Sequence, residues 1–235
     1  MTPPADIALF DSPGAPFDAP FDAAAADYDE RFCRRAPGCL LRAAVQAHLF
    51  DAFAPGARVL ELGCGTGEDA VALARRGVFV HATDAAPAML AVACEKVRRA
   101  GLEGRVACAR YDFAALAPDD VLAPAYDGAF SNFGALNVLS DVRPLARLLA
   151  RRVRPGGRVV LVVMGPLCPW EWGWYGVRGR AGTALRRLRP GRPVRLDGGR
   201  AVRVWYPSPR RLRRAFAPCF RPLRTVGVGV LLPPS

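Results

Sequence analysis

Several features that mark other classes of protein are missing from this chain of 235 residues. It has no run of about 18 apolar residues, which argues against a membrane-spanning helix. Residues 1–20 lack the basic start and apolar core of a signal peptide. The seven cysteines are odd in number, scattered and never spaced C-x-x-C, so neither a zinc site nor a disulfide framework is indicated. We therefore expect a cytoplasmic protein without a metal site.

Acidic residues are scarce in one part of the chain only. Residues 178–224 hold 15 arginines and a single acid, Asp197. The net charge of this segment, 15 − 1 = +14, is larger than the net charge of +12 of the whole chain. The first 177 residues share the richness in arginine and alanine but are not basic. The arginine cluster is therefore a property of the segment and not of the overall composition.

The chain does contain a short apolar run followed by closely spaced glycines. Val59–Leu62 is typical of a buried strand, Gly63, Gly65 and Gly67 follow at alternate positions, and residues 68–74 are typical of a helix. Glycine removes the Cβ atom where the backbone must bend sharply, and it lets a ligand touch the backbone. The first N–H groups of the helix point back toward such a ligand. The sequence therefore predicts a ligand-binding turn between a strand and a helix.

The acids around this turn restrict the kind of ligand. Dinucleotide-binding turns follow G-x-G-x-x-G and hold a pyrophosphate. Here the glycines follow G-x-G-x-G, Glu61 precedes them, and Glu68 and Asp69 open the helix. The two helix acids suit the helix dipole but would repel a pyrophosphate, so a cationic or zwitterionic ligand fits better.

The segment Glu61–Gly67 resembles the first motif of the class I S-adenosylmethionine-dependent methyltransferases of small molecules. The cofactor of that family carries a sulfonium and an amino group. The resemblance extends from about residue 21 to residue 164. It implies that cofactor contacts come from the motif itself, namely from Glu61, Gly63, Cys64, Gly65 and Gly67.

Further cofactor contacts are implied by the resemblance on either side of the motif. Residues 21–32 resemble an N-terminal helix that covers the cofactor, with Tyr28 near the methionine end; a plain amphipathic helix is the equal alternative. Asp84 ends the second predicted strand, and the resemblance assigns it to the ribose hydroxyls, a role compatible with capping the next helix. The resemblance also implies a cofactor contact at Ala85 beside it. Met89 resembles the position near the adenine, although a core methionine fits its place as well.

The end of the third predicted strand, 106–110, offers an adenine contact. The resemblance implies that Asp112 accepts a hydrogen bond from the adenine amino group, with Phe113 beside the ring. A simple turn acid is the alternative for Asp112.

The end of the fourth predicted strand, 126–132, is where the reacting methyl is expected. Ligands of open α/β sheets lie at the carboxyl ends of the strands, so we expect Asn132 and Phe133 close to the methyl group. Asn137 either orients the substrate or only caps the following helix, and the sequence favours neither.

An aromatic cluster follows the fifth predicted strand, 158–164. Three of the four tryptophans fall within residues 170–174. In a doubly wound sheet this segment overhangs the crevice, so Trp170 and Trp174 are candidates for a wall or lid around a hydrophobic acceptor. A second small core under a long loop is the alternative.

The aromatic and arginine-rich segments together suggest three classes of partner. One is an anionic, partly apolar small molecule, which includes an acyl group on an acidic carrier protein. Another is the surface of an anionic membrane. RNA is the third and ranks last, because no nucleic-acid motif accompanies the arginines. A solvated basic face without a partner is the remaining alternative.

The expected fold is a doubly wound, Rossmann-like α/β methyltransferase sandwich. The resemblance implies the strand order 3-2-1-4-5-7-6 with strand 7 antiparallel. The chain divides into a flexible N-terminus (1–20), an S-adenosylmethionine-binding core (21–165) and a substrate-side segment (166–235) that completes the same domain.

The C-terminal part offers too few strands for that order. A helix is predicted at 209–216 and a single strand at 223–232, after which two prolines follow. The final antiparallel strand is therefore expected to be missing, as in a shortened methyltransferase. The slot beside the fifth strand then stays open unless residues 201–206 fill it.

The function implied by the resemblance is methyl transfer from S-adenosylmethionine to a small or lipid-like acceptor that is partly apolar and anionic. No catalytic base is identified, because His48 lies inside a predicted helix and His81 inside a predicted strand. The alternatives are a cofactor-binding pseudoenzyme without catalysis and an RNA methyltransferase.

Overall fold

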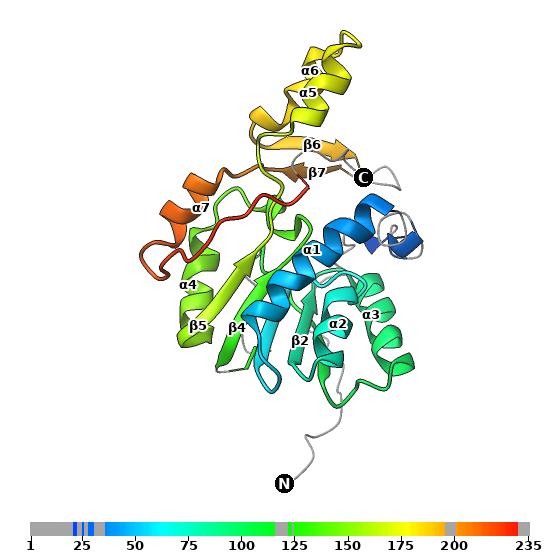
Figure 1. Cartoon of the computed structure of the whole chain (residues 1–235), viewed down its shortest axis with the longest axis vertical. Coiled ribbons are helices and arrows are strands. Elements are labelled where there is room, and N and C mark those ends of the chain that lie inside the picture. Colours follow the sequence, from blue (N-terminus) through cyan, green and yellow to red (C-terminus); the bar gives the residue numbers. More distant parts are fainter. Residues whose placement is uncertain are drawn as a thin grey trace.

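A computed structural model of the chain describes residues 21, 22, 25, 28–30, 36–115, 122, 123, 125–195 and 201–229. Its centre is a sheet of five parallel strands in the order β3-β2-β1-β4-β5 (Figure 1). The strands are β1 (Arg58–Leu62), β2 (Phe79–Asp84), β3 (Val106–Arg110), β4 (Tyr126–Ser131) and β5 (Val153–Leu161). The expected α/β class and the order of its first five strands are thus confirmed. Because the chain order reverses between β1 and β4, the carboxyl ends of these two strands form the topological switch point at which ligands of such sheets bind.

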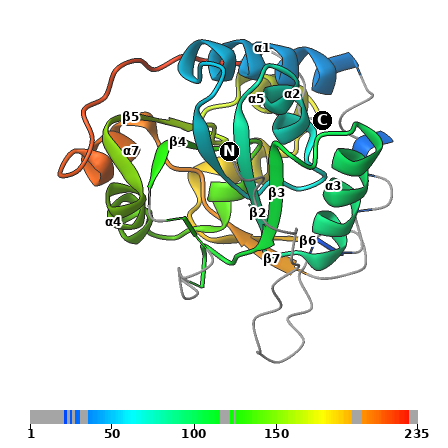
Figure 2. The ribbon, with the colours of Figure 1, turned by 90° about the horizontal axis from the view of Figure 1, so that it is seen from below.

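Two hydrophobic clusters hold helices against the two faces of the sheet. Val59 belongs to the cluster formed with α1 (Ala36–Ala52), α2 (Glu68–Arg75) and α3 (Pro87–Arg99). Its neighbour Leu60 belongs to the cluster formed with α4 (Arg143–Arg152) and α7 (Pro209–Phe216). Successive residues of a strand point to opposite faces, which explains why Val59, Leu60 and Leu62 of β1 are all apolar. Figure 2 shows α1 and α2 along one face and α4 beside the β5 end of the sheet.

The sequence placed the start of β5 too late. Residues 154–157, which precede the predicted strand 158–164, lie inside β5, because Tyr126 pairs with Val153 and Gly128 already pairs with Arg158. The extra residues of β5 form a bulge, and Gly156 takes a φ of +79° there. Pro155, Gly156 and Gly157 therefore make β5 irregular, but they do not prevent the strand from starting at Val153.

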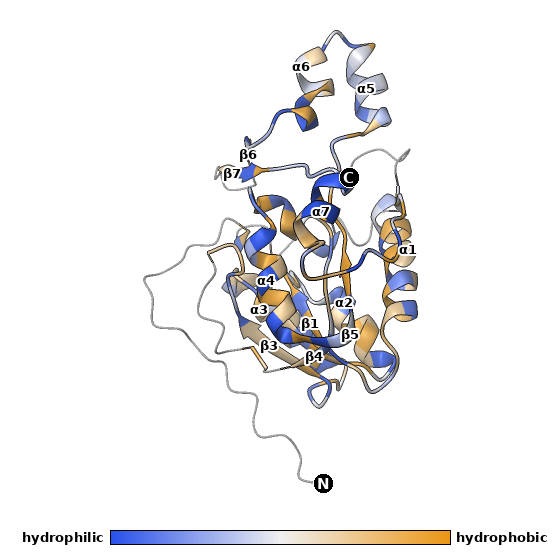
Figure 3. Ribbon diagram, turned by 90° about the vertical axis from the view of Figure 1, so that its left-hand side faces the viewer, coloured by the Kyte–Doolittle hydropathy of each residue, from blue (hydrophilic) through white to orange (hydrophobic). Residues whose placement is uncertain are grey.

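Residues 165–195 and 201–206 form a projecting lobe beyond the carboxyl ends of the strands. The lobe contains α5 (Pro169–Gly176), α6 (Ala181–Ala184), the 3₁₀ turn η5 (Arg186–Leu188) and an antiparallel pair of strands, β6 (Arg192–Arg195) and β7 (Ala201–Val204). The sequence predicted β7 but not β6. Figures 1 and 3 show α5 and α6 standing clear of the sheet and its flanking helices. The base of the lobe is fixed by the Trp205 N–H, which donates to the Asn137 carbonyl at 2.7 Å.

The C-terminal part of the chain leaves β5 as an edge strand. The helix predicted at 209–216 is α7, and Ser208 caps it, since its hydroxyl accepts the N–H of Arg211 at 3.2 Å. The strand expected at 223–232 is wrong over residues 223–229, which form no strand. Val228 instead packs against the cluster on the α1 side of the sheet. β7 pairs with β6 and not with β5, so residues 201–206 do not fill the open slot. Among the residues that the structure describes, we find none of the long apolar helices that a membrane span requires.

Candidate functional site

The glycine turn predicted from the sequence joins β1 to α2 and is built on the end of β2. The N–H groups of Gly63 and Cys64 both donate to the Thr83 carbonyl, at 2.8 and 2.9 Å. Gly63, Gly65 and Gly67 all take positive φ values, between +53° and +76°. Residues other than glycine rarely adopt this conformation, so the backbone itself accounts for all three glycines.

The surroundings separate the three glycines into two kinds. A Cβ atom added at Gly63 would lie 2.4 Å from the Ala135 Cβ, and one added at Gly67 would lie 2.9 Å from the Ala93 Cβ. A Cβ added at Gly65 would meet no protein atom within 4 Å. Gly63 and Gly67 therefore allow close packing of the protein on itself, whereas Gly65 borders the open space in which a ligand could lie.

Glu61 places a buried carboxyl group directly before this turn. The residue is 2% exposed, and its Oε2 atom has no hydrogen-bond partner among the described residues. Burial raises the pKa of Glu61 well above its usual value, and the neighbouring charge of Asp69 raises it further. A buried acceptor without a donor costs free energy. A cationic ligand that donates hydrogen bonds would remove this cost.

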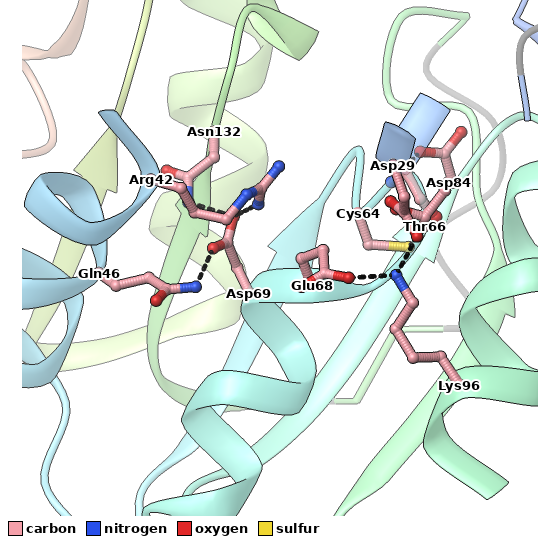
Figure 4. Close-up of polar contacts among 11 residues, drawn as sticks. Asp29, Arg42, Gln46, Cys64, Thr66, Glu68, Asp69, Asp84, Lys96 and Asn132 are labelled. Atoms are coloured by element: carbon pink, nitrogen blue, oxygen red, sulfur yellow. Dashed lines mark hydrogen bonds and ion pairs between the residues drawn. The ribbon is translucent and has the colours of Figure 1, made fainter. Parts of the chain in front are cut away.

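Asp69 is the centre of a buried polar cluster that the sequence did not reveal (Figure 4). Its carboxylate accepts hydrogen bonds from Arg42 Nη1 at 2.8 Å and Gln46 Nε2 at 2.9 Å, both from α1, and from Asn132 Nδ2 at 2.9 Å. The sequence suggested only a helix-dipole role for Asp69. The structure corrects this interpretation, because Asp69 is 3% exposed and clamps α1 and the end of β4 onto α2.

A second polar cluster ties the N-terminal segment to the same turn. Asp29 accepts a hydrogen bond from the Thr66 hydroxyl at 2.6 Å, and its other oxygen pairs with Lys96 at 2.7 Å. Lys96 also pairs with Glu68, as Figure 4 shows. The only lysine of the chain therefore neutralises one of the acids that surround the turn. No local pattern predicts these contacts, because they join residues far apart in the sequence.

Asp84 lies at the end of β2, as the sequence predicted, and supports the turn. Its two carboxylate oxygens accept the N–H groups of Gly65 at 2.8 Å and Ala86 at 2.9 Å. Burial raises the pKa of Asp84, although these backbone donors oppose the shift. Each oxygen keeps a further lone pair, so contact with ribose hydroxyls is compatible with this geometry and stays a prediction.

The predicted adenine end is partly assembled by packing. Met89 is buried against Ala25 and Ala86, with Tyr28 beside them. This arrangement supports the alternative of a core methionine. It also places Tyr28 against Ala86 and Met89 at the start of α3, and Ala86 directly follows Ala85. Six of the twelve residues of the helix expected over 21–32 lie outside the described residues.

Asp112 and Phe113 follow β3 in the predicted positions. The Asp112 Oδ1 atom accepts the N–H groups of Ala114 and Ala115, at 2.9 and 3.0 Å, while Phe113 is buried. Asp112 therefore acts as a turn acid, and both bonds fall on one of its two oxygens. The adenine contact stays a prediction.

The end of β4 combines burial with backbone strain. Asn132 is 5% exposed, and its Oδ1 atom has no hydrogen-bond partner among the described residues. Phe133 has a φ of +47°, which is unfavourable for a side chain of this size. The Arg42 guanidinium lies 4.5 Å from the centre of its ring. Strained residues of this kind gather at functional sites, and this one lies where the reacting methyl was expected.

Asn137 connects three segments instead of capping a helix. It belongs to the 3₁₀ turn η4 (Ala135–Val138), and its side chain binds both the N–H and the carbonyl of Met164, each at 2.9 Å. It also donates to the Trp205 carbonyl. The capping interpretation is therefore wrong, and in this conformation the carboxamide is occupied by backbone groups. The substrate contact stays a prediction.

The tryptophans lie on α5 in the projecting lobe. Trp170 and Trp174 stack with their ring centres 5.9 Å apart, and both side chains are exposed. The inner face of α5 carries Glu171, which is fully buried and pairs with Arg186 at 2.6 Å and Arg187 at 2.8 Å. The rings do not form a second small core, since the buried contact of this helix is an ion cluster. Their contact with an acceptor stays a prediction.

The two histidines lie in the described part of the chain, and neither gains a catalytic role from the structure. His81 lies in β2, where its Nδ1 atom is 2.6 Å from the Tyr126 hydroxyl, and burial lowers its pKa. This supports the structural role expected for His81. No group of three or more metal-ligating side chains occurs within the described part of the chain.

Comparisons with known proteins agree with this geometry. Residues 59–157 match the family model of the methyltransferase domain. The demethylmenaquinone methyltransferase of Beutenbergia cavernae is 37% identical over 129 residues, which cover 52% of this chain and 48% of the relative. The ubiquinone biosynthesis O-methyltransferase of Xylella fastidiosa is 38% identical over 106 residues, covering 44% of this chain and 40% of the relative.

A solved structure has a similar fold over most of its length. The CcbJ methyltransferase from Streptomyces caelestis superposes with a TM-score of 0.58 at 23% identity, covering 85% of this chain and 86% of that one. This likeness shows the fold. The chain spans less than half of the length of the two curated relatives. Residues 59–157 thus match a methyltransferase domain, and the motifs and the fold around them are those of the class I S-adenosylmethionine-dependent methyltransferases.

The residues at the switch point fit the cofactor of this family. S-adenosylmethionine is cationic at its sulfonium and amino groups, and the site offers the buried carboxyl of Glu61 with an unpartnered oxygen. A second unpartnered acceptor, Asn132 Oδ1, lies at the end of the adjacent strand. The open space at Gly65 leaves room for the ligand against the turn.

Proposed function

We propose that this chain is an S-adenosylmethionine-dependent methyltransferase that acts on a small or lipid-like acceptor, partly apolar and anionic. The observation that carries the proposal is the buried carboxyl of Glu61 beside an open glycine turn, with an oxygen that finds no donor among the described residues. Such a site stabilises a cationic ligand and disfavours a pyrophosphate. The domain family points to the same cofactor.

The residues of the site divide the work of binding. Glu61 balances the positive charge of the cofactor, and Asp84 holds the turn in shape while its remaining lone pairs accept the ribose hydroxyls. Asp112 and Phe113 border the adenine. The Asp69 cluster fixes Asn132 and Phe133 at the end of β4, where the acceptor must approach.

The chemistry needs alignment more than proton transfer. When bound, the cofactor supplies a methyl group on a sulfonium, which is already a reactive electrophile. The protein therefore contributes chiefly by holding a nucleophile in line with that methyl group and by excluding water. An acceptor that ionises easily requires no general base.

The acceptor class rests on two lines of support. The projecting lobe places exposed aromatic rings and arginines on the ligand-binding side of the sheet, which suits an apolar and anionic molecule. The two curated relatives are named for demethylmenaquinone and for ubiquinone biosynthesis. An acyl group on an acidic carrier protein satisfies the same chemistry.

The test is incubation of the purified chain with methyl-labelled S-adenosylmethionine and a bacterial metabolite and lipid extract. We expect label to enter an extractable small molecule or lipid, and Glu61→Gln to reduce it. Cofactor binding without any labelled product would instead indicate a non-catalytic protein. Label that disappears on ribonuclease treatment would indicate an RNA methyltransferase.

A further inference from the structure

Large apolar side chains gather on the outside of the projecting lobe. Trp174 is 47% exposed and Val177 is 83% exposed, whereas the apolar residues of the central strands β1 and β4 are buried. Spacings of four and seven residues place Trp170, Trp174 and Val177 along one stripe of α5, while Glu171 faces inward. The exposed apolar residues of the lobe are Leu167, Trp170, Trp172, Trp174, Val177, Leu185 and Leu188. Exposed apolar groups that gather in this way mark an interaction surface.

The same lobe is strongly basic. Residues 165–195 contain seven arginines and one acid, and that acid, Glu171, is buried and paired with two of them. The Arg178 guanidinium lies 3.4 Å from the centre of the Trp174 ring, so charge and aromatic surface occur together. The surface of the lobe therefore offers positive charge beside tryptophan, and residues 165–195 and 201–206 carry no exposed acid to oppose an anionic partner.

The lobe holds these rings in a fixed arrangement. The Glu171 carboxylate joins α5 to η5 through Arg186 and Arg187, and the stacked pair of Trp170 and Trp174 restricts both rings. Breaking such a buried ion cluster is costly, so the stripe on α5 is presented as a unit. Figure 3 shows that α5 and α6 stand clear of the rest of the molecule.

We propose that the α5 stripe of the projecting lobe docks onto the surface of an anionic lipid membrane. Tryptophan rings are favoured at the level of the lipid headgroups, and a surface helix that combines them with arginine binds anionic bilayers in the plane of the interface. Arginine buries its stem while its guanidinium stays with the phosphates. Docking through this lobe brings the carboxyl ends of the strands toward the bilayer (Figure 1). It does not depend on methyl transfer and would hold for a chain without activity.

Docking onto a membrane accounts for the exposed tryptophans of the lobe, which attraction between charges alone does not. Helix α7 exposes four arginines, Arg210, Arg211, Arg213 and Arg214, without an exposed aromatic residue. A partner that recognised only positive charge would bind α7 at least as well as α5. The two helices therefore provide a matched comparison within one chain.

The experiment is flotation of the full-length chain with vesicles of phosphatidylcholine mixed with phosphatidylglycerol. We expect binding at low salt, weaker binding at high salt, and little binding to phosphatidylcholine alone. Trp170→Ala/Trp174→Ala should lower the partition coefficient at least about tenfold, which is about 1.4 kcal/mol. Tryptophan emission of the unmodified chain should shift to shorter wavelength when vesicles are added.

Two control variants separate the stripe from net charge. Arg178→Ala/Arg180→Ala should weaken binding more than Arg210→Ala/Arg214→Ala, although each removes the same charge. Circular dichroism melting shows whether each variant is folded. Absence of flotation with anionic vesicles at low salt overturns the proposal. So does equal loss in the two arginine variants, or undiminished flotation of the folded tryptophan variant. Capture by an acidic polypeptide without flotation likewise overturns it and assigns the lobe to a protein.

Discussion

The switch point of the sheet and the projecting lobe depart from ordinary burial in opposite directions. At the switch point, polar groups such as Glu61, Asp69 and Asn132 are buried, and two of their acceptor atoms lack a donor among the described residues. In the lobe, tryptophans are exposed while the acid Glu171 is buried. Buried polar atoms without a hydrogen-bond partner cost free energy, and so do apolar side chains exposed to water. The switch point is therefore expected to bind a small polar ligand, and the lobe is expected to contact a large surface with an apolar part.

The largest effect on this contrast should come from Asp69. Asp69→Ala leaves the side chain of Arg42, 12% exposed, without its carboxylate and releases Gln46 and Asn132. Losing one partner of a buried ion pair costs about 3–5 kcal/mol, so thermal melting should fall sharply. Glu95→Ala is the control, because it removes an exposed acid that pairs with Arg98 and Arg99 on α3. Equal effects of the two variants would show that the Asp69 cluster has no special role.

A smaller loss of stability is expected when the close packing of the turn is disturbed. Gly63→Ala places a Cβ atom 2.4 Å from that of Ala135, and overpacking of this kind costs about 1–3 kcal/mol. Gly65→Ala has a similar positive φ but meets no atom within 4 Å, so it pays only for the left-handed backbone. Denaturant unfolding of the two variants measures the difference. If Gly65→Ala were the less stable of the two, the assignment of their roles would be reversed.

The buried carboxyl of Glu61 should make stability depend on pH. Its pKa is raised in the folded chain, so the unfolded chain ionises first as the pH rises. The protonated Glu61 favours folding fully below the unfolded pKa, and this contribution is lost as the pH rises through the folded pKa. Removing the ionisable group by Glu61→Gln should therefore raise melting temperature relative to wild type by an amount that grows from acid to neutral pH. If the difference in melting temperature between Glu61→Gln and wild type did not change with pH, the pKa of Glu61 would not be raised in the folded chain.

The smallest expected effect concerns the open edge of the sheet. Residues 159–161 of β5 pair with β4 on one side only, whereas β1 pairs on both sides with β2 and β4. Edge strands open more easily, so amide hydrogen exchange should be faster in β5 than in β1. Equal and strong protection would show that another segment or a second chain pairs with β5.

Most of the central fold could be predicted from local patterns. The strand Val106–Arg110 was predicted with its observed bounds, because apolar residues end where turn residues begin. The sequence did not reveal β6, since Arg192–Arg195 contains a single non-proline apolar residue, Val194. It predicted a strand at 223–232 that residues 223–229 do not form. An apolar run shows only that a segment can be buried, and pairing decides whether it becomes a strand.

The candidate site was predicted where a motif carried it. Glu61 and Asp84 could be located because the glycine pattern fixes the end of β1 and, with it, the end of β2. Asp69 could not, because its partners Arg42 and Asn132 come from distant parts of the chain. Side-chain clusters of this kind depend on tertiary packing, which no single stretch of sequence encodes.

The most direct test of the cofactor site is calorimetric titration of S-adenosylmethionine into wild type, Gly65→Val and Gly101→Val. Gly101 has a φ of +64° and open space around it, but it lies at the end of α3, away from the turn. Both variants therefore carry the same kind of backbone strain. We expect wild type and Gly101→Val to bind alike and Gly65→Val to bind at least about tenfold more weakly, a loss of about 1.4 kcal/mol. Unchanged affinity in folded Gly65→Val would contradict the assignment of the glycine turn as the cofactor site.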